Sequence, residues 1–341
     1  MAISKMEVRQ RFHKVMNFEP VDRLPLFEFA SWWDKTIERW RREGLPDNYK
    51  DIGEINDYLG LDKFRQFWIR PYTPDIPKVE HGHPLINNID EYKKIKTFLY
   101  PPSCNLTSSD IEKLKNYAIL QEQNKMVFWA TIEGFFWFPR RLLGIENHLY
   151  AYYDNPELIN KICQEVLAFN LMAIEKISKI CKPDFITLAE DMSYNNGPMI
   201  SKDIFEQFLA PYYIPLCKKL KESDIMIIVD SDGYVDDMID WLLNVGVDGI
   251  TPLEANAGGD VVKLRKKFPN LLMIGNFNKL IMKEGRDAMV KEFERLLPVM
   301  KRGGFVPSVD HQTPPDVSLN NYYLYLELLN EYSVRAVNKQ R

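Results

Sequence analysis

The sequence predicts an α/β fold, a single (β/α)8 TIM barrel over residues 1–341 that begins with an N-terminal helical extension. Two observations support this fold. Short apolar runs recur along the chain, and most are followed by a longer stretch with apolar residues three or four positions apart. Strand and helix repeated about eight times favour a parallel sheet with right-handed crossovers. An open doubly wound sheet is the alternative, but no G-x-G-x-x-G turn follows the first strand.

The predicted strands are apolar runs that end in a polar residue. The first is LPLFEFA (24–30), and two segments compete for the second, KFRQFWI (63–69) and HGHPLINNI (81–89). The other six are MVFWATIEG (126–134), DFITLAED (184–191), IMIIVDSDG (225–233), DGITPLEA (248–255), LLMIGNFN (271–278) and GFVPSVDH (304–311).

The predicted helices include the N-terminal extension, MAISKMEVRQRFHKVMNFEP, where charged and apolar residues alternate at helical spacing. The clearest of the helices between strands are PELINKICQEVLAFNLMAIEKISKIC (156–181) and VDDMIDWLLNVG (235–246). These helices supply the crossovers that a parallel sheet requires.

Composition argues against several classes of function. The formal net charge of −4 leaves no surplus of Lys and Arg for binding nucleic acid. No apolar run approaches the ~20 residues of a membrane span, and the first residues lack the apolar core and cleavage site of a signal peptide. We therefore expect a cytoplasmic protein without membrane or nucleic-acid partners. The cysteines form no C-x-x-C pair, so we expect reduced, buried thiols at Cys104, Cys163, Cys181 and Cys217.

Polar side chains gather at the predicted carboxyl ends of the strands, where the loops of such barrels build the active site. A ring of acids there would repel itself unless a cation, basic substrate groups or shared protons were present. We expect four of these residues to converge in one cavity as catalytic groups: Glu28, Asp191, Asp230 and His311. The strand ends also carry Glu133, Glu190, Asp232, Glu254, Asp310 and Asn276, of which Asn276 is expected to bind substrate.

His311 ends the last predicted strand, directly after Asp310 and before the stiff pair Pro314 and Pro315. An imidazole beside a carboxylate can titrate near neutral pH and move protons. The alternative is a structural histidine. If a divalent metal is present, we expect Asp230, Asp232 and His311 to bind it, although Asp232 is also a good helix cap.

Aromatic residues follow several strands and suggest a large, flat, partly apolar ligand. The segment FFWFPRR (135–141) places four aromatics beside two arginines that could pair with carboxylates. Core packing is the alternative for these aromatics, and a loop is favoured over a metal site for the histidines of HGH (81–83). The expected substrate-binding residues, besides Asn276, are Trp32, Trp33, Phe136, Trp137, Arg140 and Tyr194.

Several segments, in this order, carry a resemblance to a known family: NFEPVDRLPLFEF, KTIERWRREGLP, LLGIENHLYAYYDNPE, EDMSYNNGPMISKDIFEQFLAPYY, VDSDGYVDDMIDWLLNVGVDGITPLE, IGNFNK and SVDHQTPPDVSLNNYYLYLE. They resemble the uroporphyrinogen decarboxylase superfamily, which also contains corrinoid-linked methyltransferases. The resemblance covers nearly the whole chain and implies a (β/α)8 barrel. It also implies that His311 occupies the place of an active-site histidine and that Asp191 lies near an acidic position of the fourth strand.

Two departures from this superfamily bear on function. The decarboxylases carry an R-Q-A-G-R-Y-like segment after the first strand, whose arginines hold substrate carboxylates, and FEFASWWDKTIERW (27–40) has neither arginine. The thiol-activating methyltransferases place a His-x-Cys and a later Cys on the last strands as zinc ligands. This chain instead has Asp230-Ser231-Asp232 and Asp310-His311 at those places. A site of soft thiolate ligands is therefore not expected.

The resemblance and its departures favour a methyltransferase or demethylase that acts with a corrinoid protein on a small methylated substrate. The first alternative is a decarboxylase of a porphyrinogen-like or other acidic substrate. The second is a non-catalytic tetrapyrrole or corrinoid binder, but the sequence contains no Asp-x-His-x-x-Gly type loop. We expect no covalently bound cofactor, with any corrinoid carried by a partner protein, and the sequence leaves a homodimer open.

Overall fold

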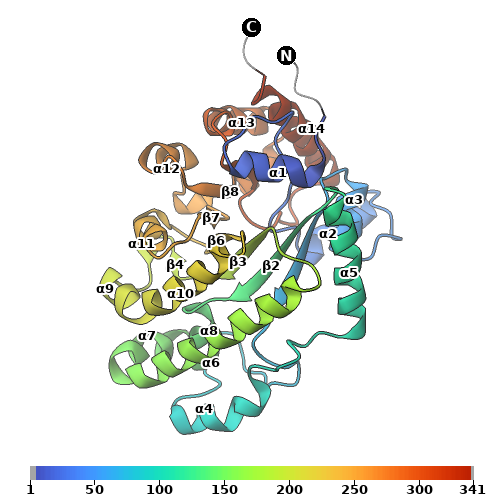
Figure 1. The fold of residues 1–341 in the computed structure, drawn as a ribbon. Helices are drawn as coiled ribbons and strands as arrows, with labels where there is room; N and C mark the ends of the chain where they lie inside the picture. Colours follow the sequence, from blue (N-terminus) through green and yellow to red (C-terminus); the bar gives the residue numbers. More distant parts are fainter. Residues whose placement is uncertain (1–4, 339–341) are drawn as a thin grey trace.

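The computed structural model describes residues 5–338 as a curled parallel sheet with helices around it (Figure 1). The sheet contains seven strands in the order β1-β2-β3-β6-β7-β8-β9, and every neighbouring pair is parallel. Strands thus follow one another in chain order. Their bounds are β1 (Phe64–Ile69), β2 (Val127–Glu133), β3 (Phe185–Ala189), β6 (Met226–Asp230), β7 (Gly249–Thr251), β8 (Leu272–Phe277) and β9 (Phe305–Val309).

Helices connect these strands, and a short hairpin of β4 (Ser193–Tyr194) and β5 (Gly197–Pro198) follows β3. The α-helices of the first half are α1 (Val8–Met16), α2 (Asp34–Arg42), α3 (Ile52–Tyr58), α4 (Ile89–Ile95), α5 (Ser108–Glu122), α6 (Trp137–Leu143), α7 (Ile145–Asp154) and α8 (Pro156–Ser178). Those of the second half are α9 (Lys202–Ile204), α10 (Ala210–Lys221), α11 (Ile239–Asn244), α12 (Val261–Lys267), α13 (Arg286–Met300) and α14 (Leu319–Arg335). Shorter turns are η1 (Lys96–Phe98), η2 (Phe205–Leu209), η3 (Asp236–Met238), η4 (Ala255–Ala257) and η5 (Lys279–Glu284).

The two faces of the sheet differ in chemistry. Side chains two positions apart share a face, and on one face Gln66 donates to Thr131 at 2.7 Å while the hydroxyls of Thr131 and Thr187 lie 2.6 Å apart. On the other face Arg65 reaches Asp57 of α3. Helix α3 therefore contacts one face at this edge of the sheet, and a row of polar side chains lies on the other.

The N-terminal extension confirms the predicted helix, although its residues 1–4 lie outside the described part of the chain. Helix α1 packs across the amino ends of several strands, where the N–H of Arg9 donates to Asn124 and the N–H of Gly304 donates to Val15. It closes that end of the sheet. No helix within residues 5–338 is long and apolar enough to cross a bilayer, and all four cysteines are free and buried.

The predicted first strand is wrong in one respect, because residues 24–30 form no regular strand. This segment still lies between the two edges of the sheet. The Phe29 N–H donates to the Ser308 hydroxyl of β9, and the Asp62 N–H, just before β1, donates to the Leu26 carbonyl. The regular element is therefore a seven-stranded curled sheet, and an irregular segment occupies the eighth position of the expected barrel.

The second strand is now located. Residues 63–69 supply β1, whereas 81–89 form a loop and the first residue of α4. The six later predictions are confirmed, each with a regular core shorter than the apolar run that predicted it.

Candidate active site

Three aspartates meet where β3 and β6 end. Asp230 is the last residue of β6, and its carbonyl accepts the N–H of Glu190 at 2.9 Å. The Asp191 carboxylate in turn lies 3.5 Å from the N–H of Asp232. Adjacent parallel strands thus bring Asp191, Asp230 and Asp232 together from positions about forty residues apart.

Asp230 is the carboxylic acid of this group with the strongest reason to stay protonated. It is enclosed by protein but keeps partial solvent access, and its side chain accepts no hydrogen bond from the described residues. Burial, followed by the charges of Asp191 and Asp232, raises its pKa well above the ordinary value. At the carboxyl end of β6, Asp230 therefore holds its proton more tightly than an ordinary aspartate does.

Asp191 is held there by a strained backbone. Its φ of 40° lies in the left-handed region, which a residue with a side chain adopts at a cost of roughly 1–3 kcal/mol. Such strain recurs at functional sites. Burial and then the charge of Asp232 raise the pKa of Asp191, while the guanidinium of Arg140 opposes that rise.

Glu190, the neighbour of Asp191, faces a different direction. Its carboxylate accepts the N–H groups of Phe135, Phe136 and Trp137 at 2.9, 2.7 and 3.1 Å, together with the hydroxyl of Tyr213. Glu190 thereby binds the start of α6 to the end of β3. Of the two adjacent acids, only Asp191 joins the aspartate group.

His311 contacts the same group through Asp232. Its Nε2 lies 3.4 Å from an oxygen of Asp232, and this contact raises the pKa of the imidazole. Asp310, the sequence neighbour, is fully buried and accepts the N–H groups of Ala255 and Lys279. The partner of His311 is therefore Asp232 and not the adjacent Asp310.

A lysine that the sequence analysis did not select supports this arrangement. The ammonium of Lys279 lies 2.9 Å from Glu254 and 3.8 Å from Asp310. Glu254 also accepts the N–H of Gly233 at 3.1 Å. Lys279 lies two residues after the end of β8. The sequence analysis selected acids at strand ends, and the same rule applied to basic residues would have selected Lys279.

Glu28 does not join the other three predicted catalytic residues. Its carboxylate contacts the hydroxyl of Ser308 and the N–H of Val309, both at 3.3 Å, and lies beside the hydroxyls of Tyr322 and Tyr325. Burial raises its pKa to about 7. Of the four residues, Asp191, Asp230 and His311 lie near one another, and Glu28 belongs to a separate closed cluster between β9 and α14.

The predicted substrate-binding aromatics divide into buried and accessible residues. Trp32 is 3% exposed and Phe136 is fully buried, so both pack inside the protein. Trp33 and Tyr194 are 43% and 49% exposed. Trp137 is half-buried beneath the guanidinium of Arg140, which lies 5.2 Å from its ring. Only the last three are placed to touch a ligand.

Asn276 has a structural environment. Its amide nitrogen donates to the carbonyls of Leu253 and Gly259, and its oxygen accepts from Arg295 at 2.9 Å. The side chain is fully buried. Because both ends of the amide are bonded to protein groups, Asn276 is not placed to bind a substrate.

The metal set considered from the sequence does not fit the geometry. Across residues 5–338, no three His, Cys, Asp or Glu side chains are grouped so that they could hold a metal ion. Asp230, Asp232 and His311 lie near one another but do not form such a ligand group. We therefore derive no step that passes through a metal.

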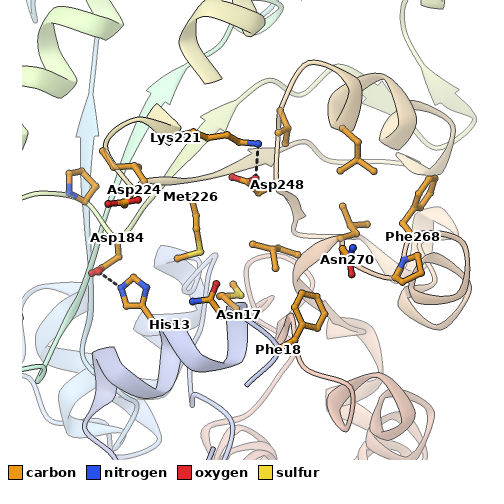
Figure 2. Close-up of a pocket in the computed structure, with 18 of the residues that line it drawn as sticks. His13, Asn17, Phe18, Asp184, Lys221, Asp224, Met226, Asp248, Phe268 and Asn270 are labelled. Atoms are coloured by element: carbon orange, nitrogen blue, oxygen red, sulfur yellow. Dashed lines mark hydrogen bonds and ion pairs between the residues drawn. The ribbon is translucent and has the colours of Figure 1, made fainter. Parts of the chain in front are cut away.

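A large cavity lies at the other end of the sheet, near the amino ends of β3, β6 and β8 (Figure 2). It measures about 940 Å³, and Figure 2 shows the imidazole of His13 pointing to Asp184 and Lys221 pointing to Asp248. These pairs are 2.6 and 3.0 Å apart. Two of the acids that line it, Asp184 and Asp248, are thus already paired, and in parallel barrels the chemistry takes place at the carboxyl end.

A family model for uroporphyrinogen decarboxylase (URO-D) matches residues 107–332, more than half of the chain and all strands from β2 to β9. The chain belongs to the uroporphyrinogen decarboxylase family. This membership confirms the resemblance seen in the sequence.

Solved structures agree at the level of fold. A methyltransferase from Methanosarcina mazei superimposes with a TM-score of 0.66 at 15% identity, covering 96% of this chain and 99% of that chain. A ruminal GH26 endo-β-1,4-mannanase covers 92% of this chain and 73% of its own at 11% identity, and its TM-score of 0.37 carries no argument. A search of curated proteins finds no significant match.

Proposed function

We propose that this URO-D family protein is a methyltransferase that removes a methyl group from a small methylated substrate and delivers it to a corrinoid on a partner protein. The observation that carries the proposal is Asp230, a buried acid without a hydrogen-bond partner among the described residues, at the carboxyl ends of the strands. Support also comes from the fold shared with a protein described as a methyltransferase.

Asp230 suits the proton that this reaction requires. When a methyl group leaves an oxygen atom, the C–O bond breaks, its electron pair stays on the oxygen, and that oxygen must gain a proton. Asp230 would donate this proton and become a carboxylate. The methyl group passes to the acceptor, which supplies the electrons of the new bond.

The groups around Asp230 prepare it for this role. Asp191 and Asp232 keep its proton bound by making a further negative charge unfavourable. His311, whose pKa is raised by Asp232, lies against that residue and would supply a proton with which to restore the acid. The cluster therefore works as a general acid with an adjacent proton reserve.

A corrinoid, when bound by a partner, would supply the nucleophile that accepts the methyl group. This chain has no Asp-x-His-x-x-Gly type loop with which to hold a corrinoid itself. The exposed rings of Trp33 and Tyr194 belong to the segments that follow residues 24–30 and β3, where a partner would approach the carboxyl ends of the strands.

Replacing Asp230 tests the proposal. Asp230→Asn keeps the size of the side chain but removes the acid, and we expect methyl transfer to fall by roughly 100-fold or more with the fold intact. The assay would incubate the chain with reduced cobalamin and a panel of methylated ethers, amines and thiols, and follow methylcobalamin by its visible spectrum. Asp203→Asn, an exposed acid of α9, is the matched control. Equal rates for Asp230→Asn and wild type would reject the role.

Decarboxylation of an acidic substrate is the second candidate, because cations that could hold carboxylates line a pocket beside the aspartates. Release of CO2 from porphyrinogen carboxylates, without formation of methylcobalamin, would favour it. The missing arginine pair after the first predicted strand leads us to expect no efficient turnover of uroporphyrinogen.

A further inference from the structure

A second cavity adjoins the aspartate group and has the opposite charge. It measures about 620 Å³ and lies among the residue that follows β1, the loop 74–85 and the start of α6. Arg140 joins the two places, because it lines the cavity and donates from Nη1 to the carbonyl of Asp191 at 2.8 Å. A molecule that fills this cavity would therefore lie next to the proposed acid.

Three arginines line this cavity without a carboxylate partner. Arg70, Arg140 and Arg141 form no ion pair with any acid in the described part of the chain. By contrast, Arg11 and Arg23 are held by Asp22 and Asp62 at 2.8 and 2.6 Å. In a chain whose net charge is −4, this cavity is a site of unbalanced positive charge.

The three guanidinium groups rest on aromatic rings instead. The central carbon of Arg70 lies 5.6 Å from the centre of the Trp68 ring. That of Arg140 lies 5.2 Å from the Trp137 ring, and that of Arg141 lies 4.3 Å from the Tyr72 ring. Stacking orients a guanidinium but leaves its N–H edge free to bind a carboxylate with two parallel hydrogen bonds. The rings of Tyr72 and Trp137, with Ile76, Val79 and Ile145, also give the cavity apolar walls.

The nearest acids do not neutralise this charge. Glu133 lies near Tyr72 and Arg141 at the end of β2, and burial raises its pKa to about 7, so it holds its proton more tightly than an ordinary glutamate and its negative charge is weakened near neutral pH. Glu80 belongs to the cavity lining but is exposed and 3.6 Å from His83. Arg140 is half-buried, and burial lowers its pKa from a very high ordinary value.

We infer that the cavity lined by Arg70, Arg140 and Arg141 binds the carboxylate of a flat, partly apolar substrate and thereby directs its reacting group toward Asp230. The binding of the carboxylate is inferred from the cavity alone. The direction of the reacting group toward Asp230 rests on the proposed function. Arg70 directly follows β1, and Arg140 and Arg141 belong to α6, which follows β2; none of them lies in the segment after residues 24–30, where the expected arginines are missing.

Binding can be measured without turnover. We would titrate the full chain by calorimetry with 4-methoxybenzoate, with its neutral counterpart 4-methoxybenzamide and with inorganic phosphate. The acid is expected to bind at least tenfold more tightly than the amide, since charge-assisted contacts to two arginines distinguish the two. Phosphate is expected to bind more weakly than the acid, because it gains nothing from the apolar walls.

Variants assign the binding to this cavity. Arg70→Gln and Arg141→Gln are each expected to weaken 4-methoxybenzoate by roughly tenfold or more and to leave the amide unchanged. Arg42→Gln, an exposed arginine of α2, is the matched control and should bind as wild type does. Thermal unfolding would verify that all three variants fold.

Several outcomes would overturn the inference: no measurable binding of the acid, equal binding of acid and amide, phosphate binding as tightly as the acid, or unchanged binding in both arginine variants. Failure of the proposed function has a different signature. If the acid binds and the arginine variants weaken it, but no methyl group is transferred from any panel compound, the binding site stands and the methyltransferase proposal falls.

Discussion

Asp184 and Asp230 lie at opposite ends of the same sheet and differ in how the protein surrounds them. Asp184 directly precedes β3, and Asp230 ends the neighbouring β6. Burial alone would raise the pKa of Asp184, but hydrogen bonding to His13 and the charge of Arg9 outweigh it and hold that pKa below the ordinary value. Its donors are Arg9 at 2.7 Å, His13 at 2.6 Å, Gln121 at 3.0 Å and the N–H of Phe128 at 2.9 Å.

Asp230 keeps partial solvent access but receives no such donors from the described residues, and the charges that act on it are those of the acids Asp191 and Asp232. The contrast separates two uses of a buried carboxylate. A carboxylate that is surrounded by donors fixes α1 and β2 to β3 and contributes to stability. A carboxylic acid left without donors is unfavourable for folding, which is the condition in which a group is available for chemistry.

The largest expected effect is a loss of stability on replacing Asp184, the acid that is surrounded by donors. Asp184→Ala leaves Arg9 and His13 without their acid and removes the acceptor of the buried Phe128 N–H, so we expect a loss of about 3–5 kcal/mol in the free energy of unfolding. Asp230→Ala should cost much less or stabilise the protein. Urea denaturation of both variants measures the difference, and equal losses would contradict it.

The next effect concerns Glu28, a third buried acid with few donors. Its pKa is about 7 in the folded protein and 4.5 in the reference state, so the folded chain holds the proton more tightly. The stability from this group is full below pH 4.5 and is lost as the pH rises to about 7. Between pH 4.5 and 8 the ionisation of Glu28 is expected to lower the free energy of unfolding by about 3 kcal/mol, and Glu28→Gln should abolish this decrease. Unfolding in urea at several pH values tests this, with the exposed Glu222→Gln as control.

His311→Gln sharpens the comparison at the carboxyl end. Gln keeps a donor and an acceptor of similar reach, so a structural histidine would tolerate the change. If His311 supplies protons to the acid cluster, the variant should fold normally and lose roughly 100-fold in kcat, about 2.7 kcal/mol. Steady-state kinetics with the best substrate of the methyl panel gives the answer. Unchanged kcat would show that the imidazole is not part of the reaction.

The smallest expected effect is a change in the titration of His311. The contact with Asp232 raises the pKa of the imidazole, so Asp232→Asn should lower it. Proton NMR of the histidine side chains across pH 5 to 9 would follow this, and Asp310→Asn should shift the pKa less because Asp310 faces Ala255 and Lys279. A larger shift in the Asp310 variant would reverse the assignment of the partner.

The strands β2, β3 and β6 to β9 could be predicted because their apolar runs are buried on both faces and read as continuous strands. Residues 24–30 show the same pattern without forming a regular strand. The reason is that side chains replace backbone partners there: Glu28 accepts the N–H of Val309, and Ser308 accepts the N–H of Phe29. A pattern of apolar residues does not reveal whether a backbone N–H will meet a carbonyl or a side chain.

The candidate site was predictable in position but not in its contacts. The strand-end rule located Asp191, Asp230 and His311, because parallel strands end at one edge. It did not predict that Asp232 reaches His311, since that contact depends on the path of two loops. Arg70 was missed because it lies directly after KFRQFWI, and the sequence alone did not select that segment as the second strand.

The irregular segment at residues 24–30 has a consequence for the order of folding. The hydrogen bond between Phe29 and Ser308 joins residues 279 positions apart, so the chain must close a very long loop to form it. β1 to β9 pair only with strands nearby in the sequence and can assemble one after another. Residues 24–30 can therefore meet Asp62 beside β1 early, but their closure against β9 is expected last, after β9 has been added to the sheet.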